Sequence, residues 1–116
     1  MRTYQNGSRK PIYYTKADTN EIVMLESSWE LRVAIRLDEL QIKWARPDPI
    51  PWKDSSGRSR LYFPDFYLSD LDTYLDPKNP YCMKLDEEKM RIISSQVHLI
   101  FGPIEHILNF IEKQSS

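Results

Sequence analysis

The stretch "LYFPDFYLSDLDTYLDPKN" (residues 61–79) decides the fold that this sequence predicts. Its two apolar runs, residues 61–68 and 73–76, are rich in tyrosine, phenylalanine and leucine, which favour strands. The polar segment "SDLD" (69–72) between them is typical of a turn. We therefore expect two strands that pair through this turn.

Three charged side chains in this stretch are candidates for chemistry. Asp65 falls in the middle of an otherwise apolar run, where a carboxylate is costly unless a cation or hydrogen-bond donors meet it. Asp76 and Lys78 project from one face of their strand, because side chains two residues apart point the same way. One interpretation is a Mg²⁺ site with an assisting lysine. The other is a turn capped by Asp76, with Lys78 paired to it at the surface.

The elements around this stretch follow from periodicity and turn signals. Residues 11–25 predict a hairpin, and the apolar spacing from Ser27 predicts a helix. The proline-rich segment 46–60 indicates a loop or an irregular edge strand. Asp86 is expected to cap a second helix and Pro103 to begin a third. The expected order is hairpin (11–25), helix (from 27), three strands (42–44, 61–68, 73–76), helix (from 86), strand (97–101) and helix (from 103).

Composition places the chain among globular proteins with one domain. It has 116 residues, of which 41 % are hydrophobic, and this length predicts a single domain, residues 1–116. The single Cys82 rules out an internal disulfide framework and is ordinary in reducing compartments. Neither a membrane span nor a secretory signal is evident. We therefore expect a cytoplasmic protein, with residues 1–10 as a flexible basic arm.

Charge is unevenly distributed although the net charge is only −1. Residues 1–16 and 43–60 are rich in lysine and arginine, whereas 65–76 carries four aspartates and no base. Basic flanks around an acidic centre suit a polyanion held over a cation site. Trp52, within the basic segment, is expected to be exposed. The residues expected to contact phosphates are Arg9, Lys10, Lys53, Arg58 and Arg60.

The sequence also resembles a known family. The motifs "SSWELRVAIRLDELQIKWARP" (27–47), "YFPDFYL" (62–68) and "YLDPKN" (74–79) are similar to those of the PD-(D/E)xK nuclease superfamily. The likeness is to its small phage and mobile-element endonucleases, related to homing endonucleases, and covers residues 22 to 101. It implies an α/β fold: a mixed sheet flanked by helices, with a restriction-endonuclease-like αβββαβ core after an N-terminal β-hairpin.

The resemblance also implies roles for particular residues. Asp65 and Asp76 correspond to metal ligands, Lys78 to the catalytic lysine and Glu30 to the acid of the first helix. Such nucleases often use the backbone carbonyl at the position of Pro77 as a further ligand. Proline keeps that carbonyl but has no N–H, so strand pairing should end or bulge on one side of Pro77.

Glu30 has a competing structural interpretation. The spacing Ser27-x-x-Glu30 is that of a capping box, in which the glutamate returns to the backbone at the start of the helix. Both interpretations remain open at this point, and Glu26 is the substitute if Glu30 is only a cap. Gln96 is expected to close the second helix.

The expected function is therefore a metal-dependent DNA endonuclease that hydrolyses phosphodiester bonds. Mg²⁺ is the expected cofactor, and Mn²⁺ is an alternative to it. So small a chain would need a homodimer or larger assembly to cut both strands, and otherwise would nick. If the protein is phage-encoded, the host cytoplasm is its compartment. The alternative is a catalytically inactive module on the same fold that binds nucleic acid or a partner nuclease.

Overall fold

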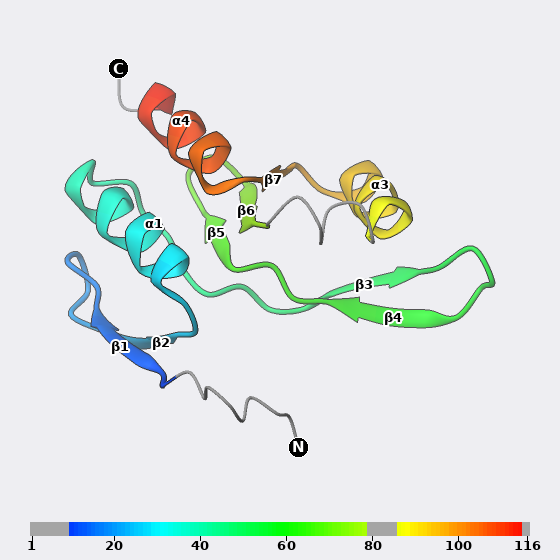
Figure 1. Cartoon of the computed structure of the whole chain (residues 1–116), viewed down its shortest axis with the longest axis horizontal. Coiled ribbons are helices and arrows are strands. Elements are labelled where there is room, and N and C mark those ends of the chain that lie inside the picture. The colour runs from blue at the N-terminus through cyan, green and yellow to red at the C-terminus, as the bar shows by residue number, and fades with distance from the viewer. Residues whose placement is uncertain (1–9, 79–85, 115–116) are drawn as a thin grey trace.

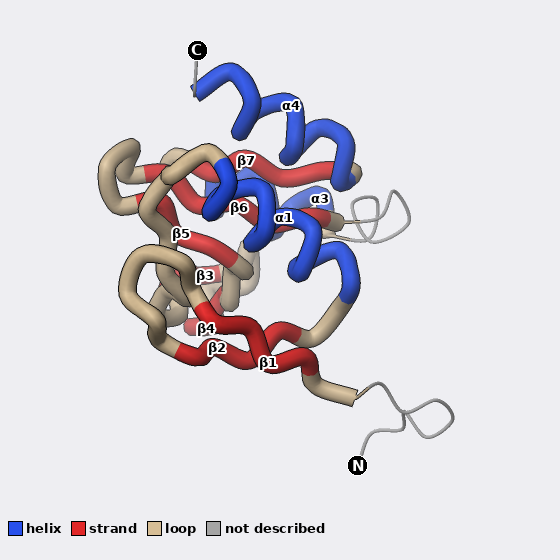
Figure 2. Tube along the Cα trace, turned by 90° about the vertical axis from the view of Figure 1, so that its left-hand side faces the viewer, coloured by secondary structure: helices blue, strands red, loops and turns tan. Residues whose placement is uncertain are grey.

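Three small sheets and three helices make up the part of the chain that the computed structural model describes, residues 10–78 and 86–114. The mixed α/β class agrees with the sequence prediction. Figure 1 shows the elements in chain order, and Figure 2 shows them from the side. Within the described residues, no helix is long and apolar enough to span a membrane.

The N-terminal part follows the prediction. Strands β1 (Ile12–Thr15) and β2 (Ile22–Leu25) pair antiparallel, which confirms the first hairpin. Helix α1 (Ser28–Glu39) begins after Ser27, whose Oγ accepts a hydrogen bond from the backbone N–H of Glu30 at 3.1 Å. This cap satisfies one of the amide groups that a helix start leaves unpaired.

The segment that follows α1 differs from the prediction. Residues 42–44 form no strand; their neighbour Ala45 makes only an isolated bridge with Tyr67. The proline-rich segment instead forms a second antiparallel hairpin, β3 (Ile50–Lys53) and β4 (Ser59–Tyr62). Its ladder has only two strands, so a proline is tolerated where its missing N–H would face away from the partner.

The central sheet has three strands in the order β5-β6-β7. Strands β5 (Phe66–Leu68) and β6 (Thr73–Pro77) are antiparallel, which confirms their pairing through the turn at 69–72. Strand β7 (Leu99–Gly102) runs parallel to β6.

The prediction of one strand over residues 61–68 is wrong. The chain leaves the β3–β4 sheet after Tyr62 and enters the central sheet at Phe66, with Pro64 in between. Proline has no N–H to donate to a ladder, so a break here is favoured. Asp65 therefore lies immediately before β5 and not in the middle of a strand.

Pairing around Pro77 is one-sided, as the sequence predicts. On the β5 side, the last residue of β6 that pairs is Leu75, whose partner is Phe66. On the β7 side, pairing continues through Pro77 and Gly102, and the N–H of Lys78 donates to the Gly102 carbonyl at 2.7 Å. The missing N–H of proline thus costs no hydrogen bond with β7.

Helices cover both faces of the central sheet. Helix α4 (Ile104–Gln114) lies beside α1 over one face, where they bury a cluster that includes Val33, Phe66 and Leu75. Helix α3 (Glu87–Gln96) and the β3–β4 hairpin cover the other face, and their cluster includes Tyr62 and Met90. The residues that follow β4 and those that end β6 lie between these two layers.

Trp52 belongs to the second cluster and is only 8 % exposed. The expectation of an exposed Trp52 is therefore wrong. Alternation along β3 turns its side chain inward with Ile50, toward α3, while Pro51 and Lys53 face solvent. A segment interpreted as a loop or an irregular edge strand predicts no regular alternation, which is why the sequence analysis missed it.

Candidate functional site

The end of β6 places a carboxylate and an ammonium group side by side. Lys78 Nζ lies 3.4 Å from Asp76 Oδ2, and Asp76 is only 5 % exposed. The same carboxylate accepts a hydrogen bond from the hydroxyl of Tyr62, the last residue of β4. Lys78 Nζ is also 3.8 Å from Asp86 Oδ2 at the start of α3. The ion pair between Asp76 and Lys78 that the structural interpretation predicts is therefore present, but it is mostly buried and does not lie at the surface.

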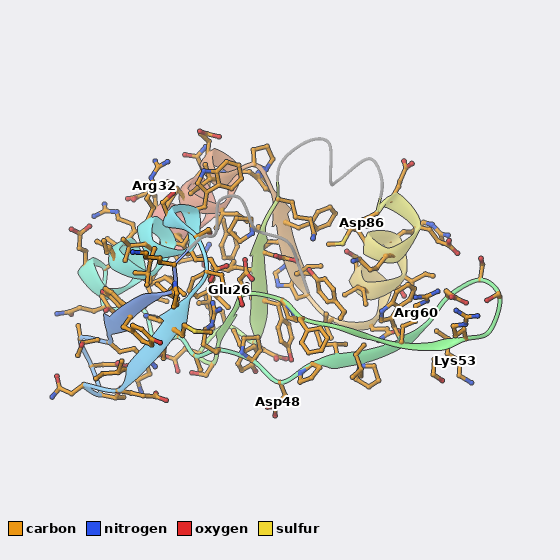
Figure 3. The ribbon with its side chains drawn as sticks, turned by 60° about the horizontal axis from the view of Figure 1, so that its bottom comes forward. Glu26, Arg32, Asp48, Lys53, Arg60 and Asp86 are labelled. Carbon is orange, nitrogen blue, oxygen red and sulfur yellow. The ribbon has the colours of Figure 1, made fainter. Side chains whose placement is uncertain are left out.

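Glu30 is both a cap and a member of this region. Its Oε1 accepts from the backbone N–H of Glu26 at 3.1 Å, so it does return to the chain before the helix, one residue earlier than a capping box requires. The same oxygen lies 3.0 Å from the guanidinium of Arg46. Glu30 is 7 % exposed whereas Glu26 is exposed, which favours Glu30 over its substitute. Figure 3 labels Glu26, between β2 and α1.

Arg46 joins Glu30 to the segment that carries Asp65. One of its terminal nitrogens contacts Glu30, and the other donates to the backbone carbonyl of Asp65 at 3.0 Å. Its guanidinium carbon lies 5.7 Å from the centre of the Phe66 ring, within the range of a cation–π contact. Arg46 thus fixes the start of α1 against the start of β5.

The pKa of Asp65 is affected by all of these charged groups. Burial, and then the negative charges of Asp76 and Glu30, raise the pKa of Asp65 to about 8. The positive charges of Arg46 and Lys78 act in the opposite direction without restoring the usual value. Burial also raises the pKa of Asp76, although Lys78 opposes it. The raised pKa of Asp65 therefore follows first from burial and second from the two neighbouring acids.

These groups fit a divalent cation in part. Among the described residues no donor makes a hydrogen bond or ion pair with the Asp65 carboxylate; only its backbone carbonyl accepts one. No group of three histidine, cysteine, aspartate or glutamate side chains in that same part of the chain could hold a metal by itself. Mg²⁺ does not require one, because it keeps several waters and is often held by one or two carboxylates. Asp65, Asp76 and the Pro77 carbonyl are the groups that could hold such an ion.

The sequence analysis assigned no part in the site to four residues of this region: Arg46, Tyr62, Asp86 and Lys89. Burial raises the pKa of Tyr62, so its hydroxyl stays protonated as the donor to Asp76. Lys89 Nζ lies 3.5 Å from Asp86 Oδ2 and 5.5 Å from the centre of the Tyr62 ring. Asp86 is the N-cap residue of α3 as predicted, but its side chain makes no capping hydrogen bond. Only the position of Asp86 was visible in the sequence.

The residues expected to contact phosphates lie on separate parts of the fold. Lys53, Arg58 and Arg60 are exposed on the β3–β4 hairpin, and Figure 3 labels Lys53 and Arg60 there. Arg60 Nε is 2.7 Å from an oxygen of Asp54, so part of its charge is balanced. Lys10 is exposed ahead of β1.

Three sequence predictions concern residues outside the described part. Arg9 and the first nine residues of the basic arm belong to residues 1–9, and Cys82 belongs to residues 79–85.

Gln96 is the last residue of α3, as the sequence predicts. Its Nε2 donates a hydrogen bond to the Pro51 carbonyl at 3.0 Å, which links the helix to the β3–β4 hairpin.

No protein-family model, curated protein or solved structure matches this chain. The functional interpretation therefore depends on the geometry of the site and on the resemblance of its motifs.

Proposed function

We propose that this protein is a metal-dependent DNA endonuclease whose site consists of Glu30, Asp65, Asp76 and Lys78. One observation carries the proposal: side chains from α1, the approach to β5 and the end of β6 come together at one place. Lys78 contacts Asp76 there, and Asp65 lies within the field of all three others. The PD-(D/E)xK assignment and its αβββαβ core are part of the same proposal.

Each residue would have a distinct task. Asp65, Asp76 and the carbonyl of Pro77 would hold Mg²⁺ or Mn²⁺, which polarises a phosphodiester and lowers the pKa of bound water. Lys78 would orient the attacking water or stabilise the charge that develops on the phosphate. Tyr62 keeps Asp76 in place through its hydrogen bond, and Glu30 would shape the site from the helix side.

The cleavage of supercoiled plasmid tests this proposal. The wild-type protein should convert it to nicked or linear DNA in millimolar Mg²⁺ and not in EDTA. Asp65→Ala and Asp76→Ala should lose cleavage while keeping the far-UV circular dichroism spectrum of the wild type. Linear product that appears only above a threshold protein concentration would support action as a homodimer. Cleavage by both variants at the wild-type rate would refute the site.

A binding module without catalysis is the second candidate. It is favoured by the internal pairing of two acids, Glu30 with Arg46 and Asp76 with Lys78. The melting temperature with and without Mg²⁺ or Mn²⁺ separates the candidates, because a ligand that binds only the native state raises it. The nuclease predicts a rise that Asp65→Asn abolishes. Unchanged melting at millimolar metal, together with DNA binding, would favour the module.

A further inference from the structure

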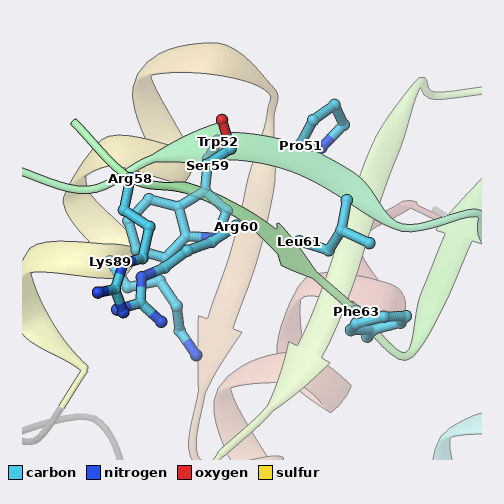
Figure 4. Close-up of a pocket in the computed structure, with 8 residues that line it drawn as sticks. All are labelled: Pro51, Trp52, Arg58, Ser59, Arg60, Leu61, Phe63 and Lys89. Carbon is cyan, nitrogen blue, oxygen red and sulfur yellow. The ribbon is translucent and has the colours of Figure 1, made fainter.

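An open groove of about 600 Å³ runs along β4 and reaches α3. The groove combines two kinds of side chain. Arg58, Arg60 and Lys89 bring three positive charges to it; Arg60 is paired with Asp54 and Lys89 with Asp86, but neither carboxylate lines the groove. Figure 4 shows these three on one side of the view and Leu61 and Phe63 on the other.

The apolar part of the groove is unusually exposed. Leu61 is 57 % exposed and Phe63 is 66 % exposed. Tyr62 between them turns inward to the core and to Asp76, while Leu61 and Phe63 stay exposed. A large aromatic ring in water beside cations is typical of surfaces that stack on nucleic-acid bases.

The groove adjoins the candidate site along the chain, although none of the site's four residues lines it. Phe63 precedes Asp65 by two residues, and an extended chain advances at most about 3.6 Å per residue. The α-carbons of Phe63 and Asp65 are therefore within about 7 Å of each other. Phe63 is exposed whereas its neighbour Tyr62 turns inward to Asp76, so the groove and the site are neighbouring but separate surfaces.

We propose that this groove binds DNA containing an unpaired nucleotide. This inference deepens the proposed function and rests on it. Phe63, with Leu61 beside it, stacks on the exposed base, while Arg58, Arg60 and Lys89 hold the backbone phosphates. The preferred substrates are bulged, branched or single-stranded DNA, and fully paired duplex binds less tightly.

The preference for an unpaired base follows from the side chain itself. Bases within a duplex already stack on their neighbours, so offering a face to Phe63 would first cost unstacking and unpairing. An unpaired nucleotide has already lost its base pair and much of its stacking, so this cost is small. Flexible cations alone would bind any DNA through its phosphates and would not distinguish the two.

A second copy of this chain is the other occupant to consider. A two-fold contact places the same patch of both subunits together, which would bring three cations of one copy near the same three of the other. Such like-charge contact is unfavourable. Nucleic acid, with its negative backbone, complements the groove instead.

Binding without cleavage tests the inference. Fluorescence anisotropy in EDTA would compare a labelled duplex, the same duplex with one unpaired nucleotide, and the single strand. The wild type should bind the unpaired-nucleotide DNA at least about fivefold more tightly than the duplex, as expected for one stacked base. Phe63→Ala should remove that preference, and Phe63→Trp should keep it. Tyr13→Ala is the matched control, because Tyr13 is an equally exposed aromatic (69 %) on β1.

Arg58→Ala supplies a second readout. It should weaken binding to all three DNAs by a similar factor and reduce the salt slope by about 1. Equal wild-type affinity for all DNAs, or a preference that survives Phe63→Ala, would overturn the inference. It would also be overturned if Phe63→Ala left binding unchanged but turned a dimer into a monomer by sedimentation, since the groove would then join two copies.

The outcome is separable from that of the proposed function. A Phe63-dependent preference without any Mg²⁺-dependent cleavage would sustain the groove and reject the nuclease. Cleavage of plasmid without any dependence of DNA preference on Phe63 would sustain the nuclease and reject the groove.

Discussion

Replacing Asp65 by asparagine should stabilise the metal-free protein at alkaline pH. The pKa of Asp65 is about 8 in the folded chain and 3.8 in its ordinary state. Between these values the native protein holds a proton that the unfolded chain has lost. Stability therefore falls as the pH rises from about 4 to about 8 and stays low above that. The asparagine side chain of Asp65→Asn does not titrate, so the stability of this variant should not fall over this pH range.

The size of the effect follows from the same two pKa values. At about 1.4 kcal/mol per pH unit, the difference corresponds to an upper limit of about 6 kcal/mol. Asparagine still buries a polar group, and Asp76 shares the repulsion, so we expect roughly half, about 2 to 3 kcal/mol at pH 9. At about 4 °C per kcal/mol, that is a rise of about 10 °C in melting temperature.

The assay is thermal unfolding in EDTA from pH 4 to pH 9, with wild type and Asp65→Asn side by side. The two curves should meet near pH 4 and diverge as the pH rises toward 8. The exposed Asp70→Asn on the β5–β6 turn is the control and should follow the wild type. Parallel curves for wild type and Asp65→Asn would refute the raised pKa of Asp65, and with it the burial of this carboxyl group among other acids.

Three further predictions concern the neighbours of the site. Arg46→Met should lower the free energy of unfolding by about 1 to 3 kcal/mol, measured in urea, because it leaves the buried Glu30 without its cation; an unchanged midpoint would contradict this. Tyr62→Phe removes a donor that lowers the pKa of Asp76, so the acidic limb of the pH–rate profile for cleavage should move to higher pH; an unmoved limb would argue against a role for ionised Asp76. Phe66→Ala should cost about 3 to 5 kcal/mol by urea unfolding, because it empties the core beneath α1 and α4; a cost below 1 kcal/mol would mean that the core collapses around the gap.

Regular periodicity made much of the fold predictable. The β1–β2 hairpin, α1, the β5–β6 pair, α3, β7 and α4 all have local patterns that tertiary packing reinforces. The pairing that ends on one side of Pro77 was also predictable, because it follows from a covalent property of proline.

Prolines made the β3–β4 hairpin and the break before β5 hard to predict. Three of them in residues 46–60 argued against a strand, yet a two-stranded ladder needs only every second N–H. Pro64 divided a run that composition alone presents as continuous. Both errors hid the inward turn of Trp52 and Tyr62, and with it the contact between Tyr62 and Asp76.

The site was predictable as a set of residue types and not as a set of contacts. Asp76 and Lys78 share a face by strand periodicity, so their proximity followed from sequence. Arg46 lies in an irregular segment, and its contacts with Glu30 and the Asp65 carbonyl depend on how α1 meets β5. Long-range packing of this kind leaves no local pattern.

The central claim is that Lys78 and the acids beside it form one catalytic site, and the cleavage activity of Lys78→Ala tests it most directly. Wild type, Lys78→Ala and the control Lys113→Ala, at the far end of α4, would be incubated with supercoiled plasmid in saturating Mg²⁺. The account predicts nicked or linear product from wild type and Lys113→Ala, and intact plasmid from a folded Lys78→Ala. Cleavage by Lys78→Ala at the wild-type rate would contradict it.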